Sequence, residues 1–144
     1  MTAPPPADPS TSLFDDALQR YRDGVPPEQL VDDFLAITSQ APRQSAGWTC
    51  LAWLQLLLGQ AEDALRSART AVRLNPQDPQ ARINLSLAML ETGTAGVREH
   101  VDSVRRVIVM APDLADELRE SVADGLQRRP HWPALEKIKV WLEF

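Results

Sequence analysis

Apolar residues recur three or four positions apart along almost the whole chain, an interval that places them on one face of an α-helix. Between these stretches the sequence is rich in the residues that end helices, and no stretch alternates in the manner of a strand. The pattern therefore predicts an all-α chain of about eight helices. The expected helices cover residues 12–21, 27–37, 45–58, 61–74, 81–90, 97–110, 113–129 and 134–142.

The helix boundaries are marked by glycine, proline and capping residues. Gly59 and Gly93 are expected to end helices, and Pro79 is placed well for a first helical residue. We expect Ser45, Asp78 and Asp113 to cap the helices that follow them, because a side-chain oxygen there can accept a bond from a free backbone N–H.

Matched residues recur at a spacing of 34. Phe14 of the first copy matches Trp48 of the second, and Pro42 matches Pro76. A third copy follows two residues late and closes at Pro112. Self-similarity at this period is the signature of a stacked array of helix pairs. The small residues on the fourth expected helix, such as Ala64 and Ala71, would let neighbouring pairs pack closely.

With this period and these breakers, the chain resembles the tetratricopeptide repeat (TPR) family. The middle copy matches the family's large aromatic residue, leucine, loop glycine, two alanines and closing proline with Trp48, Leu51, Gly59, Ala64, Ala71 and Pro76. The first copy is degenerate, and the third has Arg82 at the aromatic position. The resemblance gives repeats at about 11–44, 45–78 and 79–114, followed by capping helices at 113–129 and 133–142, within one domain over residues 13–144.

The resemblance implies a right-handed helical solenoid whose first helices line a concave groove that binds peptides or helices of other proteins. The repeat frame then assigns a set of side chains to the groove. These are Asp15, Gln19, Thr49, Trp53, Ile83, Asn84 and Leu87.

Two of these residues have specific interpretations. Asn84 stands where many family members use asparagine to hold a peptide backbone, and the alternative is a capping or solvated amide. Trp53 is either an aromatic anchor for a partner or a packed core residue. Asp15 stands where the family's best-known variant places a cation for a C-terminal carboxylate, so acidic tails are not expected ligands.

Two further surfaces are candidates for contacts. Arg66, Arg69 and Arg73 share one face of a helix, which we interpret as a solvated outer face rather than a site for phosphate or an acidic partner. Trp132 and Trp141 lie near the end of the chain. The last helix either folds back to cap the array or presents an apolar patch to a partner or to a second copy of the chain.

Composition restricts the remaining choices. Residues 1–12 are rich in proline and poor in apolar residues, so we expect a disordered tail. No apolar run in the chain is long enough to span a bilayer and no secretory signal is recognisable, which gives the expectation of a cytoplasmic protein without membrane insertion. A net charge of −5 makes nucleic acid an unfavourable partner. Cys50 is the single cysteine and is interpreted as a small core residue.

Motifs for chemistry are missing from the sequence. Neither His100 nor His131 has a second histidine or cysteine at a metal-ligand spacing, and no phosphate loop or nucleophile elbow occurs. We therefore expect no cofactor, no metal and no enzymatic activity. The leading hypothesis is a non-catalytic protein–protein interaction module, an adaptor or assembly factor, and the alternative is a self-associating scaffold subunit that uses the C-terminal aromatic helix.

Overall fold

The computed structural model describes the backbone of residues 9–144 and the side chains of residues 13–144. Residues 1–8 of the expected disordered tail lie outside the described residues. The tail was expected to extend to Ser12, but the first helix already begins at Pro9. Proline is accepted in a first helical turn, because its missing N–H would have no partner there.

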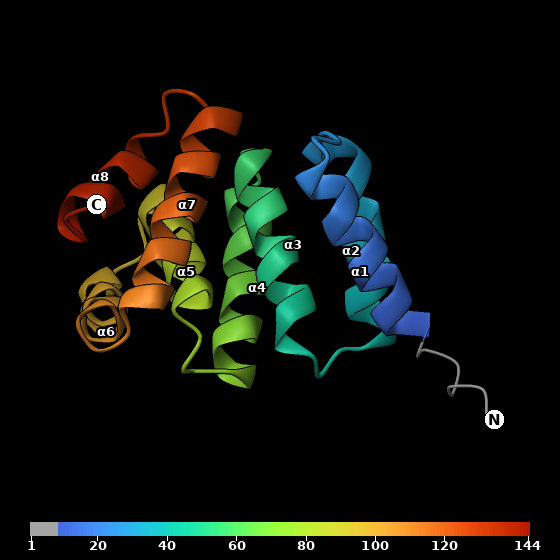
Figure 1. The fold of residues 1–144 in the computed structure, drawn as a ribbon, viewed down its shortest axis with the longest axis horizontal. Helices are drawn as coiled ribbons and strands as arrows, with labels where there is room; N and C mark the ends of the chain where they lie inside the picture. The colour runs from blue at the N-terminus through green and yellow to red at the C-terminus, as the bar shows by residue number, and fades with distance from the viewer. Residues whose placement is uncertain (1–8) are drawn as a thin grey trace.

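The described residues form eight helices in antiparallel succession, which confirms the predicted all-α class and the stacked arrangement of helix pairs. Figure 1 shows the pairs following one another from α1 and α2 on the right to α8 on the left. The helices are α1 (Pro9–Arg22), α2 (Pro27–Gln40), α3 (Ser45–Leu57), α4 (Ala61–Leu74), α5 (Pro79–Thr92), α6 (Val97–Met110), α7 (Pro112–Arg128) and α8 (Pro133–Trp141).

The predicted helix ends are confirmed at α5 and differ at two other helices. The Asp78 side chain accepts a bond from the Gln80 N–H, and Gly93 ends α5 in the left-handed conformation with φ of 70°. Ser45 is instead the first residue of α3, and Gln44 occupies the cap. Asp113 follows Pro112 in the first turn of α7. Its negative charge stabilises the positive N-terminal end of the helix dipole, but its side chain makes no capping hydrogen bond.

Helices α3 and α5 form the centre of the molecule, because both are buried on nearly every side. In α3 the buried residues run without interruption from Leu51 to Leu56, and in α5 they run from Ile83 to Met89. A helix that is apolar all round must be covered all round. Helices α2, α4, α6 and α8 supply that cover, and the first pair contributes a smaller cluster built on Leu30, Phe34 and Ile37.

The last helix folds back onto the array. Trp132, Leu135 and Ile138 are fully buried, and α8 packs on both α5 and α7. The Trp132 indole N–H donates to the Glu91 carboxylate at 2.6 Å, and the Arg129 guanidinium donates to the same oxygen at 2.8 Å. α8 therefore closes the end of the hydrophobic core.

A glycine inside α7 permits a close approach of this helix to α3 and α8. A Cβ atom at Gly125 would lie 2.7 Å from Cη2 of Trp53 and 2.8 Å from Cδ2 of Leu135. Real Cβ atoms do not come this close to other heavy atoms, so any larger residue would push α7 away from α3 and α8. The absence of a side chain here lets the Trp53 ring lie directly against the α7 backbone.

We predict that Gly125→Ala destabilises the protein. Overpacking against Trp53 and Leu135 outweighs the gain in helix propensity and should lower the free energy of unfolding by about 1 to 3 kcal/mol, measured by urea denaturation.

Gly47→Ala is the matched control, since Gly47 is also helical. Its added Cβ would meet Cγ2 of Ile37 at 3.2 Å, a side-chain methyl that can move, so the change should stay below about 1 kcal/mol. Equal effects of the two substitutions would contradict this account of the α3–α7 contact.

Candidate functional site

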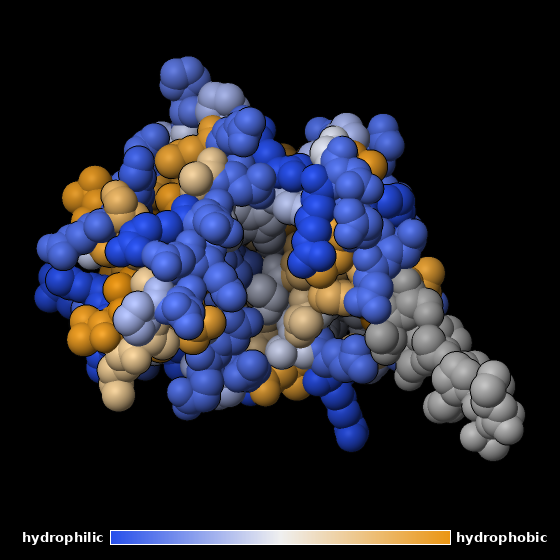
Figure 2. All heavy atoms as spheres, viewed as in Figure 1, coloured by the Kyte–Doolittle hydropathy of each residue, from blue (hydrophilic) through white to orange (hydrophobic). Residues whose placement is uncertain are grey.

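One face of the molecule is hollowed between the first helix pair and α7. The hollow has a volume of about 510 Å³, and Figure 2 shows it between blue, hydrophilic rims with paler side chains deeper inside. This volume falls in the range of about 300–1,000 Å³ that ligand pockets occupy. We call it the central groove. Its lining includes Leu18, Tyr21, Arg22, Thr49, Cys50, Trp53, Gln80, Asn84, Glu117, Glu120, Ser121, Asp124 and Arg128.

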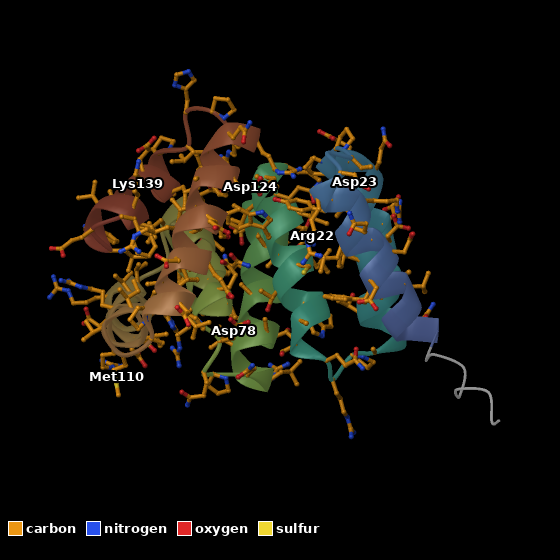
Figure 3. All side chains as sticks on the ribbon, viewed as in Figure 1. Arg22, Asp23, Asp78, Met110, Asp124 and Lys139 are labelled. Atoms are coloured by element: carbon orange, nitrogen blue, oxygen red, sulfur yellow. The ribbon has the colours of Figure 1, made fainter. Side chains whose placement is uncertain are left out.

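The groove has two walls and a floor. α1 forms one wall and α7 the other, and α3 and α5 lie between them as the floor. Figure 3 shows Arg22 on α1 and Asp124 on α7 turned toward the space between the two helices. The floor combines the apolar surfaces of Cys50 and Trp53 with the polar side chain of Thr49. Such a mixture suits a ligand that has both apolar side chains and a polar backbone.

Leu18 contributes apolar surface that the fold itself does not use. It lines the groove from α1, is partly exposed, and belongs to neither of the two hydrophobic clusters of the described residues. Its neighbour along the helix, Tyr21, packs against both clusters. Covering Leu18 would thus remove apolar area from water without disturbing the core.

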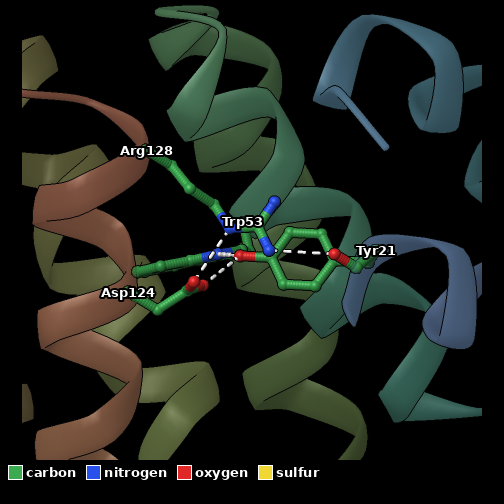
Figure 4. A network of polar contacts seen from close by, with 4 residues as sticks. All are labelled: Tyr21, Trp53, Asp124 and Arg128. Atoms are coloured by element: carbon green, nitrogen blue, oxygen red, sulfur yellow. Dashed lines mark hydrogen bonds and ion pairs between the residues drawn. The ribbon is translucent and has the colours of Figure 1, made fainter. Parts of the chain in front are cut away.

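A polar network joins the two walls to the floor (Figure 4). The Trp53 indole N–H donates to the Tyr21 hydroxyl at 2.8 Å, and that hydroxyl donates to Asp124 at 2.5 Å. Arg128 donates to the other oxygen of Asp124 at 2.8 Å and to the Tyr21 backbone carbonyl at 2.9 Å. Its guanidinium carbon also lies 3.8 Å from the centre of the Tyr21 ring. We call these four residues the wall network.

The surroundings of the wall network keep Tyr21 neutral. Burial raises the pKa of the Tyr21 hydroxyl well above its ordinary value of 10.0, and the bond to Asp124 raises it further. The bond from Trp53 opposes this shift. Tyr21 therefore stays protonated and keeps donating to Asp124 at neutral pH.

Cys50 on the floor is an unreactive thiol. Desolvation raises its pKa to about 12, and the charge of Asp78 adds to the rise while Arg22 opposes it. The interpretation as a small, largely apolar residue therefore agrees with its surroundings, although it lines the groove instead of lying in the core interior.

The structure brings three of the predicted groove residues together. Thr49, Trp53 and Asn84 all line the central groove. Asn84 is fully buried, however, and its amide is used inside the fold: it donates to the Thr49 carbonyl at 3.0 Å and accepts from Gln80 at 2.9 Å. It links α3 to α5 and has no accessible surface with which to hold a peptide. Trp53 is 9% exposed, so it is mainly a packed residue with one edge at the groove.

The other four predicted groove residues lie elsewhere. Ile83 and Leu87 are buried in the main hydrophobic cluster, because the crowded centre of the array covers the faces of α5 that the repeat frame assigned to the groove. Asp15 and Gln19 are exposed on α1 but are not part of the groove lining, and Gln19 donates to Asp23 in the turn that follows the helix.

The two secondary surfaces also have definite places. Arg66, Arg69 and Arg73 are exposed on α4, away from the groove, and Arg66 pairs with Asp63 of the same helix. Trp132 is fully buried and tilted against Trp53 at a centroid distance of 5.6 Å, so it offers no surface to a partner. Trp141 is 39% exposed, with the Lys137 ammonium 5.9 Å from its ring centre.

Sequence reasoning missed the α7 wall of the groove. Residues 113–129 were interpreted as a capping helix, so the acidic residues Glu117, Glu120 and Asp124 were not assigned to the site. The signal that could have found them is Gly125, a glycine in the middle of a helical stretch, which indicates a close helix contact.

Neither His100 nor His131 lines the groove. His100 lies outside it, and its Nδ1 accepts from the Arg82 guanidinium at 2.9 Å. Burial and the charge of Arg82 lower the pKa of His100. Within residues 9–144 no three His, Cys, Asp or Glu side chains are grouped to hold a metal ion, and no helix has the length and apolarity needed to cross a membrane.

The comparisons with known proteins show what this fold is similar to. No family model and no curated protein matches the chain. Among solved structures, it is similar to the type III secretion translocator chaperone SycD of Yersinia enterocolitica, in a structure described as an alternative dimer, with a TM-score of 0.68 and 20% identity over 96% of this chain and 98% of SycD. A second SycD structure, in complex with a peptide of the translocator YopD, has a TM-score of 0.68 and 20% identity over 94% of this chain and 95% of SycD. At this identity the likeness establishes the helical fold.

We predict that Tyr21, the only tyrosine of the chain, ionises only when the protein unfolds. Because its pKa is raised in the folded state, it stabilises the fold fully below about pH 10, the pKa of an unfolded tyrosine, and this stabilisation is lost as pH rises further. Tyrosinate absorbance should therefore rise together with the loss of the helical circular dichroism signal.

The reference titration is the same protein in concentrated guanidinium chloride, where absorbance should rise near pH ~10. Absorbance that rises there in the folded protein, with helicity retained, would disprove the neutral, bonded state of Tyr21.

Proposed function

We propose that this protein binds a segment of another protein in the central groove and acts as a non-catalytic adaptor or chaperone. The observation that carries the proposal is the combination of a hollow of about 510 Å³ with Leu18, an apolar side chain at its wall that is left out of both hydrophobic clusters. Surface of this kind is stabilised when a partner covers it. Such binding needs no catalytic group.

The likeness to SycD supports this choice of ligand. SycD has been crystallised with a peptide of YopD, and the alignment spans nearly the whole of both chains. A fold that accommodates a peptide in one protein offers a scaffold for peptide binding in another, and the residues of the site decide whether it binds. In this chain the surface available to a peptide is the central groove.

The proposal includes two further assignments, the repeat units and the location in the cell. We take the three helix pairs at about 11–44, 45–78 and 79–114 as TPR units, with α7 and α8 completing the domain. We also take the protein to act in the cytoplasm. Both assignments rest on the repeat spacing and on the similarity of fold.

Leu18→Gln tests the site. Short random-sequence peptides, selected from a display library for binding to the wild-type protein, should bind this variant about tenfold or more weakly, because a buried leucine contributes roughly 1.5–3 kcal/mol. Affinity is measured by fluorescence polarisation of the labelled peptides.

Leu13→Gln is the matched control, since Leu13 is a 41% exposed leucine of the same helix outside the groove. It should leave peptide affinity unchanged. Selected peptides that bind all three proteins equally would refute groove binding.

Self-association is a second candidate function, favoured by exposed apolar residues on α8. Val140 is 71% exposed and Trp141 is 39% exposed, beside a smaller hollow of about 390 Å³ lined by Val101 and Arg105 of α6. If these residues form a dimer contact, Val140→Lys should convert a dimer into a monomer in light scattering at high concentration. A wild-type protein that is already monomeric there would eliminate this candidate.

A further inference from the structure

The two walls of the central groove carry opposite charge. On the α7 wall, Glu117 and Glu120 are exposed and lie three residues apart, so both belong to one face of the helix. On the α1 wall the exposed charged residue is Arg22. No residue that the structure describes forms an ion pair with any of these three side chains.

The other charges near the α7 wall are already compensated or turned away. Asp124 is paired with Arg128 at 2.8 Å within the wall network. Arg119, which lies between the two glutamates in sequence, pairs with Asp116 at 2.9 Å and stacks over Phe144 at 5.0 Å. It therefore does not neutralise the groove-facing carboxylates. The α7 wall is left with a net negative charge beside the apolar surface of Leu18 and Trp53.

Arg22 places a positive charge on the α1 wall, opposite the negative charge of the α7 wall. A cationic ligand group would be repelled at the α1 wall and attracted at the α7 wall, while an anionic group would favour the reverse placement. Two carboxylates against one guanidinium make the cationic placement the stronger one. Lysine and arginine also have long apolar stems, which can cover the floor while the charged end reaches a rim.

We infer that the segment bound in the central groove carries a lysine or arginine next to an apolar residue, with the basic side chain against Glu117 and Glu120 and the apolar side chain on Leu18 and Trp53. This inference rests on the proposed function and specifies its ligand. An acidic or uncharged peptide is the competing outcome.

The test compares peptides selected from the same random display library against the wild-type protein and against the double variant E117Q/E120Q. Peptides from the wild-type selection should be enriched in lysine and arginine beside apolar residues. Those from the double variant should keep the apolar residues and lose the basic ones. In the best wild-type peptide, replacing its basic residue by glutamine should weaken binding to the wild-type protein by about threefold to tenfold, and less at high salt, as expected for exposed ion pairs.

The double variant E62Q/E136Q is the matched control. Glu62 on α4 and Glu136 on α8 are exposed carboxylates outside the groove, so this variant changes the net charge by the same amount. It should select the same basic peptides as the wild-type protein. Replacing the basic residue of the peptide by glutamine should hardly change its affinity for E117Q/E120Q, but should still weaken its binding to E62Q/E136Q. This comparison isolates the interaction between the basic residue and the two groove glutamates.

The failure of this inference is distinguishable from the failure of the proposed function. Selected peptides that bind Leu18→Gln weakly but show no basic enrichment, or show acidic enrichment, would overturn the inference and leave groove binding intact. Selected peptides that bind Leu18→Gln as well as they bind the wild-type protein would overturn both.

Discussion

The position of the Trp53 indole determines how the groove is built. One side of the ring lies against the bare backbone of Gly125 and another against Trp132, while its N–H donates to Tyr21. Four helices, α1, α3, α7 and α8, are therefore fixed relative to each other through one side chain. A large aromatic ring is suited to this, because it buries a wide apolar area and still offers one polar atom at its edge.

The walls of the groove are held by polar contacts, and the space between them stays open. α1 packs on α2, and α7 packs on α6 and α8, so the two walls meet mainly through Tyr21, Asp124 and Arg128. The consecutive residues Arg128 and Arg129 reach in different directions: Arg128 binds α1, and Arg129 binds the Leu56 carbonyl and Glu91 on the floor helices. These bonds fix the spacing of the walls without filling the space between them.

The sequence predicts the fold well and the site only in part. Helical periodicity, prolines and glycines are local signals, and they placed all eight helices and the bounds of α4 and α6. Thr49 and Trp53, which the repeat frame assigned to a groove, line the hollow because α3 is its floor. Ile83 and Leu87 do not line it, since the burial of α5 depends on α6 and α8, which no repeat frame specifies. The α7 wall was missed for the same reason: whether a final helix covers an end or faces a hollow depends on long-range packing at Gly125.

The wall network joins residues that are 103 and 107 positions apart in the chain. Contacts this far apart in sequence have a larger loop-closure entropy than contacts between neighbouring pairs, so we expect them to form after the intervening pairs have stacked. During synthesis α1 leaves the ribosome well before its counterpart α7. The central groove therefore gains its second wall only after α7 has been made, although α1, α3 and α5 can already have folded.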